Sequence, residues 1–119
     1  DEVSVSAPTL VAELMDGAVS TYTLTPEQFG MPRSALDAII VGSVDESLAM
    51  VKSVLANGTG PARDIVLLNA GAALYAANLT DSIAGGIDLA REALATGEAA
   101  RRLEALATLS QTLAEAHSS

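Results

Sequence analysis

Hydrophobic and polar residues alternate along the first quarter of the chain. The segments VSVSA and TLVAEL, and then AVSTYTL, carry β-branched and apolar residues with partial alternation, and Asp16-Gly17 is a strong turn signal. Pro8 indicates that the first stretch breaks, bends or lies at a sheet edge. The pattern predicts a β-hairpin over residues 3–24.

A connector over residues 25–42 follows the expected hairpin. Within TPEQFGMP, Thr25 is expected as an N-cap and Pro26 as the first residue of a single helical turn, which Gly30 ends. From there the hydrophobic period becomes helical, which predicts helices over residues 43–116.

Four helices are expected in this part of the chain. Ser43 and Glu46 have the spacing of a capping box, and Pro61 opens a helix whose sequence IVLLNAGAALYAA is apolar on nearly every side. Such a helix is typically buried all round. The apolar stripes of the other three helices are Val44, Leu48, Val51 and Leu55; Ile83, Ile87, Ala90 and Leu94; and Leu103, Leu106, Leu109 and Leu113.

A β-hairpin followed by about four helices is an incomplete set of elements. A two-stranded sheet is marginally stable alone, and the helix that begins at Pro61 needs neighbours on several sides. We therefore expect the 119 residues to form part of a larger α/β domain.

Composition narrows the possible functions. The net charge of −9 and the pI near 4.2 argue against binding to nucleic acid or to an anionic membrane surface, and no apolar stretch is long enough to span a bilayer. The absence of Cys excludes thiolate metal sites, so a cytoplasmic location is the default. A phosphorylated ligand needs a divalent cation, or basic groups from another segment, to approach this acidic chain.

Adjacent carboxylates at Asp1 and Glu2 are the one metal candidate. They are suited to Mg²⁺, which takes one or two carboxylates together with phosphate oxygens and waters. Neighbouring residues on a strand point to opposite faces, so the pair can share a site only from a loop or bulge. On the residues alone, a solvated acidic pair is the favoured interpretation.

Other polar residues have simpler explanations. Asn69, within the apolar helix, is either a ligand contact or, as we favour, an amide bonded to nearby backbone. Arg63 can meet a phosphate, but an ion pair is favoured, and Gly85-Gly86 indicates close helix packing. His117 lies in a tail expected to fray and is rejected as a catalytic base.

Several segments, in the same order and spacing, resemble anthranilate phosphoribosyltransferase. They are APTLVAELMDGAVSTYTLTPEQFGMP, GPARDIVLLNAGAALYAA and DSIAGGIDLAREALATGEA. The resemblance implies that residues 1–119 are the C-terminal portion of an α/β domain of the nucleoside phosphorylase/phosphoribosyltransferase type. It implies a pentosyltransferase of tryptophan biosynthesis that transfers the phosphoribosyl group of phosphoribosyl pyrophosphate to anthranilate and releases pyrophosphate. It also implies Mg²⁺ on the pyrophosphate, with Asp1 and Glu2 at the position of the family's metal-binding carboxylates.

The chain also departs from the family pattern. Several features of the family are expected upstream of these residues and are not in this chain. They are the Gly-Thr-Gly-Gly-Asp segment, the Lys-His-Gly-Asn segment, the residues that contact anthranilate, and the helical domain through which members form homodimers. We therefore expect the 119 residues alone to be inactive. The alternatives are a non-catalytic acidic helical interaction module and a related pyrimidine nucleoside phosphorylase.

Overall fold

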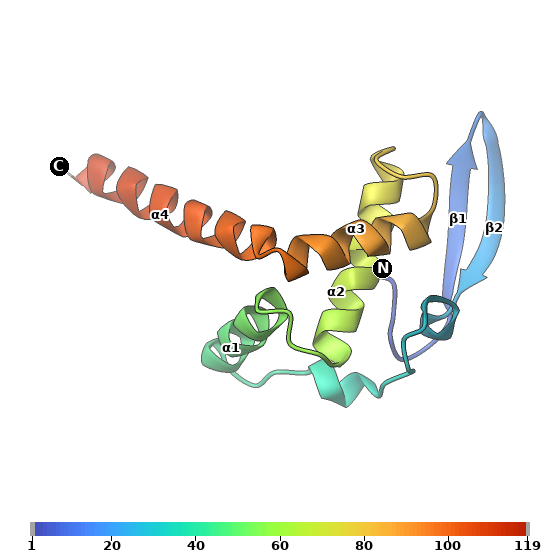
Figure 1. Cartoon of the computed structure of the whole chain (residues 1–119), viewed down its shortest axis with the longest axis horizontal. Coiled ribbons are helices and arrows are strands. Elements are labelled where there is room, and N and C mark those ends of the chain that lie inside the picture. Colours follow the sequence, from blue (N-terminus) through green and yellow to red (C-terminus); the bar gives the residue numbers. More distant parts are fainter. Residues whose placement is uncertain (1, 119) are drawn as a thin grey trace.

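The computed structural model describes residues 2–118 and shows an antiparallel hairpin followed by four α-helices (Figure 1). Two short 3₁₀ turns, η1 and η2, lie between the hairpin and the first helix. The elements are β1 (Thr9–Met15), β2 (Ala18–Leu24), η1 (Pro26–Phe29), η2 (Leu36–Ile39), α1 (Val44–Leu55), α2 (Pro61–Ala76), α3 (Ile83–Ala95) and α4 (Glu98–Ser118).

The hairpin turns at Asp16-Gly17, as predicted. Both residues have positive φ, 51° and 78°, which is the backbone of a type I′ turn and matches the twist of the two strands. The turn sets the register, in which Met15 faces Ala18 and Thr9 faces Leu24.

The strands begin at Thr9 rather than at residue 3. Backbone groups of residues 3–5 take no part in strand pairing, since Ser4 N–H donates to the side-chain Oγ1 of Thr9 at 3.0 Å and Ser34 N–H donates to the Val5 carbonyl at 3.0 Å. Pro8 has no N–H to donate, and it separates this segment from β1. The alternation in VSVSA therefore reflects the burial of Val5, which is 1% exposed, and not a strand.

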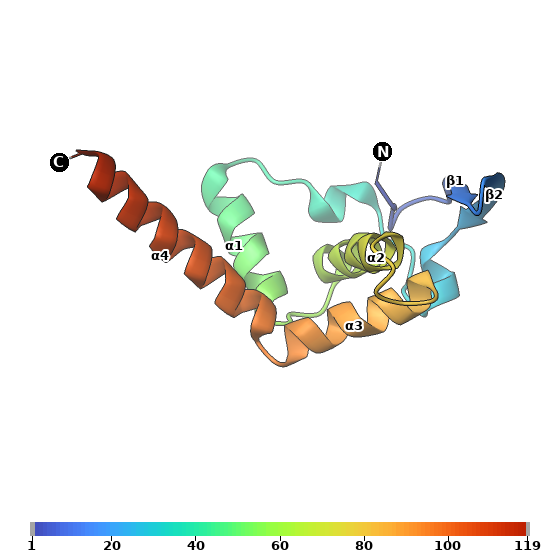
Figure 2. The ribbon, with the colours of Figure 1, turned by 90° about the horizontal axis from the view of Figure 1, so that it is seen from above.

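Helix α2 is the centre of the fold. Leu67 and Leu68 are almost fully buried and pack with residues of the N-terminal segment, the connector after η1, α1 and α3, namely Val5, Met31, Val54, Ile87, Ala90 and Leu94. Figure 2 shows α2 lying between α3 on one side and the N-terminal segment on the other. One part of α2 is open, however, and Val66 is 42% exposed, so the helix is not buried all round within these residues.

Helix α4 projects away from the other elements (Figures 1 and 2). Its residues 101–118 are exposed, including the predicted stripe Leu103, Leu106, Leu109 and Leu113. The stripe is on one face, as the sequence pattern indicates, but no described element covers it. No helix among residues 2–118 is both long and apolar enough to cross a membrane.

Candidate functional site

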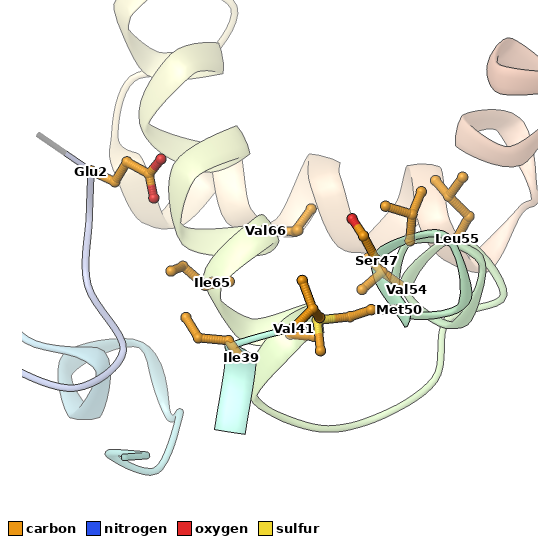
Figure 3. A pocket seen from close by; sticks show the side chains of 11 residues that line it. Glu2, Ile39, Val41, Ser47, Met50, Val54, Leu55, Ile65 and Val66 are labelled. Atoms are coloured by element: carbon orange, nitrogen blue, oxygen red, sulfur yellow. The ribbon is translucent and has the colours of Figure 1, made fainter. Parts of the chain in front are cut away.

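Of the predicted metal pair, Glu2 can be placed, whereas Asp1 lies outside the described residues. Glu2 is exposed and lies in irregular backbone ahead of β1, beside the middle of α2 (Figures 1 and 3). Because Glu2 is not in a strand, the strict alternation that would separate it from its neighbour does not apply here. Two adjacent carboxylates require a loop or bulge if they are to share a metal ion, and Glu2 lies in such a loop.

The backbone next to Glu2 is held by the side chain of Asn69 on α2. Val3 N–H donates to Asn69 Oδ1 at 2.9 Å, and Asn69 Nδ2 donates to the Val3 carbonyl at 2.9 Å. Nδ2 also donates to the carbonyl of Ile65, one turn earlier on α2, at 2.9 Å. The favoured prediction for Asn69 is confirmed, since its amide bonds backbone, but one of its partners is 66 residues away.

An open apolar pocket of about 430 Å³ lies between α1, α2 and the segment that precedes α1 (Figure 3). Glu2 lies at one end of it, next to α2, while Met50, Val54 and Leu55 of α1 lie at the other. Ser47 is the other polar residue of the lining, and the remaining side chains are Ile39, Val51, Val54, Leu55, Ala62, Ile65 and Val66. This wall can bury apolar surface, but it offers no oriented general base or phosphate cradle.

Carboxylate and phenol groups meet at the joint between the hairpin and α2. The Tyr22 hydroxyl donates to Glu13 Oε1 at 3.2 Å, and Tyr75 of α2 lies against the same carboxylate. Burial and then the charge of Glu13 raise the pKa of Tyr22, whereas the hydrogen bond to Glu13 is the main cause that raises the pKa of Tyr75. Sequence reasoning missed this group, because nothing in the hydrophobic pattern relates Glu13 to Tyr75.

Arg63 does not form the ion pair that we favoured. Its Nη1 donates to Asn57 Oδ1 at 3.0 Å, and the three ion pairs among residues 2–118 do not include it. The loop before α2 places Asn57 against Arg63 because Asn57 takes a positive φ of 63°, which Asn tolerates better than most residues. The Nε atom of Arg63 is buried without a hydrogen-bond partner in the described structure.

His117 lies in a helix rather than in a frayed tail. Helix α4 continues to Ser118, with His117 Nδ1 2.7 Å from the Leu113 carbonyl and Ser118 Oγ donating to the Ala114 carbonyl at 2.9 Å. These local bonds satisfy groups at the helix end. His117 is nevertheless exposed in the last turn of α4, a helix that projects away from the other elements (Figure 1), so its rejection as a base is unchanged.

The donor chemistry near Glu2 fits a hard cation. No group of three or more His, Cys, Asp or Glu side chains gathers in a metal-binding arrangement within residues 2–118. Mg²⁺ does not need such a group, since it is commonly held by one or two carboxylates and completes its shell with phosphate oxygens and waters. Glu2 supplies one carboxylate of that kind, exposed and on anchored backbone.

A model of the glycosyl transferase family, a/b domain, matches residues 1–100. The chain therefore belongs to this glycosyl transferase family.

The relatives that the chain matches are anthranilate phosphoribosyltransferases. The chain is 54% identical over 114 residues to the anthranilate phosphoribosyltransferase of Methylococcus capsulatus and 49% identical over 113 residues to that of Nitrosomonas eutropha. These matches cover 96% and 95% of the chain and 33% of each relative. The chain thus spans about a third of the length of the curated relatives that it matches.

The fold has a counterpart among solved structures. The crystal structure of anthranilate phosphoribosyltransferase from Thermus thermophilus superimposes with a TM-score of 0.68 at 39% sequence identity. The superposition covers 82% of this chain and 34% of that structure. The sequence-based fold class is confirmed: the chain is a hairpin followed by four helices, and the solved structure that it superimposes on is a phosphoribosyltransferase.

Proposed function

We propose that this chain works as the C-terminal portion of an anthranilate phosphoribosyltransferase of tryptophan biosynthesis. The observation that carries the proposal is the match of nearly the whole chain, at about half identity, to relatives of that name. In the reaction, the anthranilate nitrogen forms a bond to C1 of the phosphoribosyl group. The C1–oxygen bond to pyrophosphate breaks, the leaving oxygen takes the electron pair, and the nitrogen loses a proton.

We further propose that Asp1 and Glu2 hold the Mg²⁺ that accompanies phosphoribosyl pyrophosphate. When bound, this ion neutralises negative charge on the leaving pyrophosphate. An acidic chain with a net charge of −9 repels a polyphosphate substrate, so a cation at these carboxylates also reduces that repulsion. The exposure of Glu2 and its position in a loop support this role.

The remaining chemistry is expected to come from outside these 119 residues. The pocket beside Glu2 is apolar, Arg63 is bonded to Asn57, and the ion pairs occupy Arg33, Arg101 and Arg102. This arrangement supports the proposal that substrate binding requires the rest of a protein of the relatives' length. We expect the 119-residue chain alone to show no transfer.

The metal role is tested in the full-length protein by replacing both carboxylates, Asp1→Ala and Glu2→Ala. We expect the Mg²⁺ and phosphoribosyl pyrophosphate concentrations needed for half-maximal rate to rise by about 10-fold or more, because the ligands of the ion are lost. A matched control, Glu92→Ala with Glu104→Ala, removes two exposed carboxylates on α3 and α4 and should leave both requirements unchanged. Wild-type requirements in the first variant would refute the metal role.

Activity assays on the full-length protein distinguish the catalytic proposal from its two alternatives. Product formation from anthranilate and phosphoribosyl pyrophosphate, with release of one pyrophosphate per turnover, supports the proposal. Phosphorolysis of a pyrimidine nucleoside without anthranilate transfer would indicate the related phosphorylase. If neither reaction occurs in the full-length protein, a non-catalytic interaction module is the better interpretation.

A further inference from the structure

We infer that Asn69 is a positioning residue that fixes the direction of the Glu2 carboxylate. The inference rests on the proposed metal role of Glu2. Asn69 itself touches neither Glu2 nor any substrate. It acts through the backbone of Val3, which is joined to Glu2 by one peptide bond.

The Asn69 amide binds Val3 as a neighbouring β-strand would. One N–H to Oδ1 bond and one Nδ2–H to carbonyl bond, both 2.9 Å, use the donor and the acceptor of the same residue. The Val3 N–H and the Val3 carbonyl belong to two successive peptide planes, so the two bonds restrain both planes. The plane that contains the Val3 N–H also contains the Glu2 carbonyl and the Glu2 Cα, so the restraint reaches the atom from which the carboxylate extends.

The third bond fixes which way the amide points. Nδ2 has two hydrogens, and the second goes to the Ile65 carbonyl at 2.9 Å. If the amide were turned over, Oδ1 would face two carbonyl oxygens and Nδ2 would face the Val3 N–H, so all three bonds would be lost. Only the observed orientation makes all three.

Both sides of this link are attached to the core. Leu68, directly before Asn69, is 0% exposed, and Val5, two residues after Val3, is 1% exposed. Asn69 and Gly71 are about 200° apart around α2, so the amide faces the N-terminal segment while the opposite face packs on α3. The backbone that carries Glu2 is therefore held against the core.

Glu2 has no other restraint in the described structure. Its side chain is exposed, and it makes no hydrogen bond or ion pair with any of residues 3–118. A carboxylate that is free in solvent depends on its backbone for direction. Metal-site carboxylates are sensitive to such supporting contacts, whose loss typically weakens metal binding by about 10-fold to 100-fold.

The test measures Mn²⁺ affinity by electron paramagnetic resonance in the full-length protein, with inorganic pyrophosphate present. The variants are Asn69→Leu, which removes all three bonds, and Asn69→Asp, which has the same shape but turns a carboxylate oxygen toward two carbonyls. We expect the Mn²⁺ affinity to fall by about 10-fold in both. Asn69→Asp keeps the test valid if Asn69→Leu does not fold.

Ile87→Val is the matched control for loss of stability. Ile87 is 2% exposed and packs against α2 at Gly71, on the face opposite Asn69. We expect this variant to lower the unfolding temperature and to leave the Mn²⁺ affinity at the wild-type value. A merely structural role for Asn69 predicts the same result for the Asn69 variants, and that result would overturn the inference.

Glu2→Gln distinguishes failure of this inference from failure of the metal role. Weak Mn²⁺ binding in Glu2→Gln with wild-type binding in the Asn69 variants refutes the positioning role alone. Wild-type binding in Glu2→Gln refutes the metal role, and the inference with it. Weak binding in both sets supports the inference, and the transfer assay with anthranilate separately decides the catalytic proposal.

Discussion

A single carboxylate, Glu13, connects the hairpin to the helical part of the chain. It accepts a hydrogen bond from Tyr22 across the two strands and lies against Tyr75 of α2. The protonated phenols are the favoured partners of a negative carboxylate, so the contact raises the pKa of both. The hairpin is therefore attached to α2 by polar as well as apolar contacts.

The pH dependence of this contact has a definite sign. For both tyrosines the folded-state pKa exceeds the unfolded value, so the stabilisation is fully present below about pH 10 and is lost as the pH rises through the raised pKa. We expect Glu13→Ala to lower both pKa values toward 10, and Tyr75 more than Tyr22, because the bond to Glu13 is the main cause only at Tyr75. Titration of assigned tyrosine ring signals by NMR measures this.

Glu104→Ala, on α4, is the control for the tyrosine titration. Its carboxylate is exposed on the helix that projects away from the hairpin, so both tyrosine pKa values should stay where they are in the unsubstituted chain. Unchanged tyrosine pKa values in Glu13→Ala would contradict the contact.

Among the elements, α2 and α3 pack most closely, and two glycines make this possible. A Cβ on Gly86 would lie 2.2 Å from the Gly71 carbonyl oxygen, and a Cβ on Gly71 would lie 2.5 Å from Ile87 Cγ1. The predicted reason for Gly85-Gly86, close helix contact, is thus correct for Gly86. Gly71 likewise has no room for a methyl group against α3.

The close contact of α2 and α3 predicts that alanine substitutions at two neighbouring glycines differ in their effect on stability. Gly86→Ala should lower the free energy of unfolding by about 1–3 kcal/mol, since the new methyl group meets backbone that must move. Gly85→Ala should change it by less than about 1 kcal/mol, because its Cβ meets side-chain atoms rather than backbone, the nearest being Ser82 Oγ at 3.3 Å, and helix propensity improves. Urea denaturation gives both values. Equal stability of the two variants would show that the helices do not approach this closely.

The molecule as a whole exposes more surface than a compact domain of its mass. Its accessible area is 7841 Å², whereas a 12.0 kDa globular protein is expected to expose roughly 6,000 Å². Its radius of gyration is 16.7 Å against about 13.5 Å for a compact chain of this length. The pocket wall on α1 and α2 and the leucine stripe of α4 contribute to this excess. Surfaces of this kind are normally covered by other protein.

A substitution in the leucine stripe of α4 is expected to have different effects on stability in the 119-residue chain and in a longer protein. In the 119-residue chain, Leu106→Gln should change the free energy of unfolding by less than about 0.5 kcal/mol, because Leu106 is 63% exposed. In a protein of the relatives' length we expect a cost of about 1–3 kcal/mol, since a polar amide would replace a covered side chain. Thermal unfolding of both proteins checks this.

Leu68→Ala, at a residue that is 0% exposed, is the reference for the leucine test and should cost about 2–5 kcal/mol in either protein. A large effect of Leu106→Gln in the short chain would contradict the exposure of α4.

Much of the fold could be predicted from the sequence because its signals are local. Asp16-Gly17 sets a two-residue turn, Ser43 Oγ accepts from Glu46 N–H at 3.1 Å as a capping residue should, and the stripe that contains Ile87 is buried. The capping box is only half formed, since Glu46 Oε2 accepts from Gly42 N–H at 2.6 Å rather than from Ser43. Each of these signals depends on residues within a few positions of one another.

Less of the candidate site than of the fold could be predicted from local sequence signals. Asp1 and Glu2 acquired a metal role only through resemblance, and that role remains a prediction. The polar residue within an all-apolar helix was the available signal for Asn69, and it predicted a backbone partner correctly. It did not identify Val3, because the hydrogen-bonding pattern of an amide contains no information about which distant segment will lie beside it.

The sequence by itself determined the elements, their order and the apolar faces that they carry, because turns, caps and hydrophobic periods follow from short-range sterics and solvation. Only the tertiary structure decided which faces meet: Asn69 with Val3, Gly71 with Gly86, and Glu13 with Tyr75. These pairings are set by the packing of α2 between two partners, and they join residues that lie far apart in the sequence. The direction that we propose for Glu2 depends on one of these pairings, that of Asn69 with Val3.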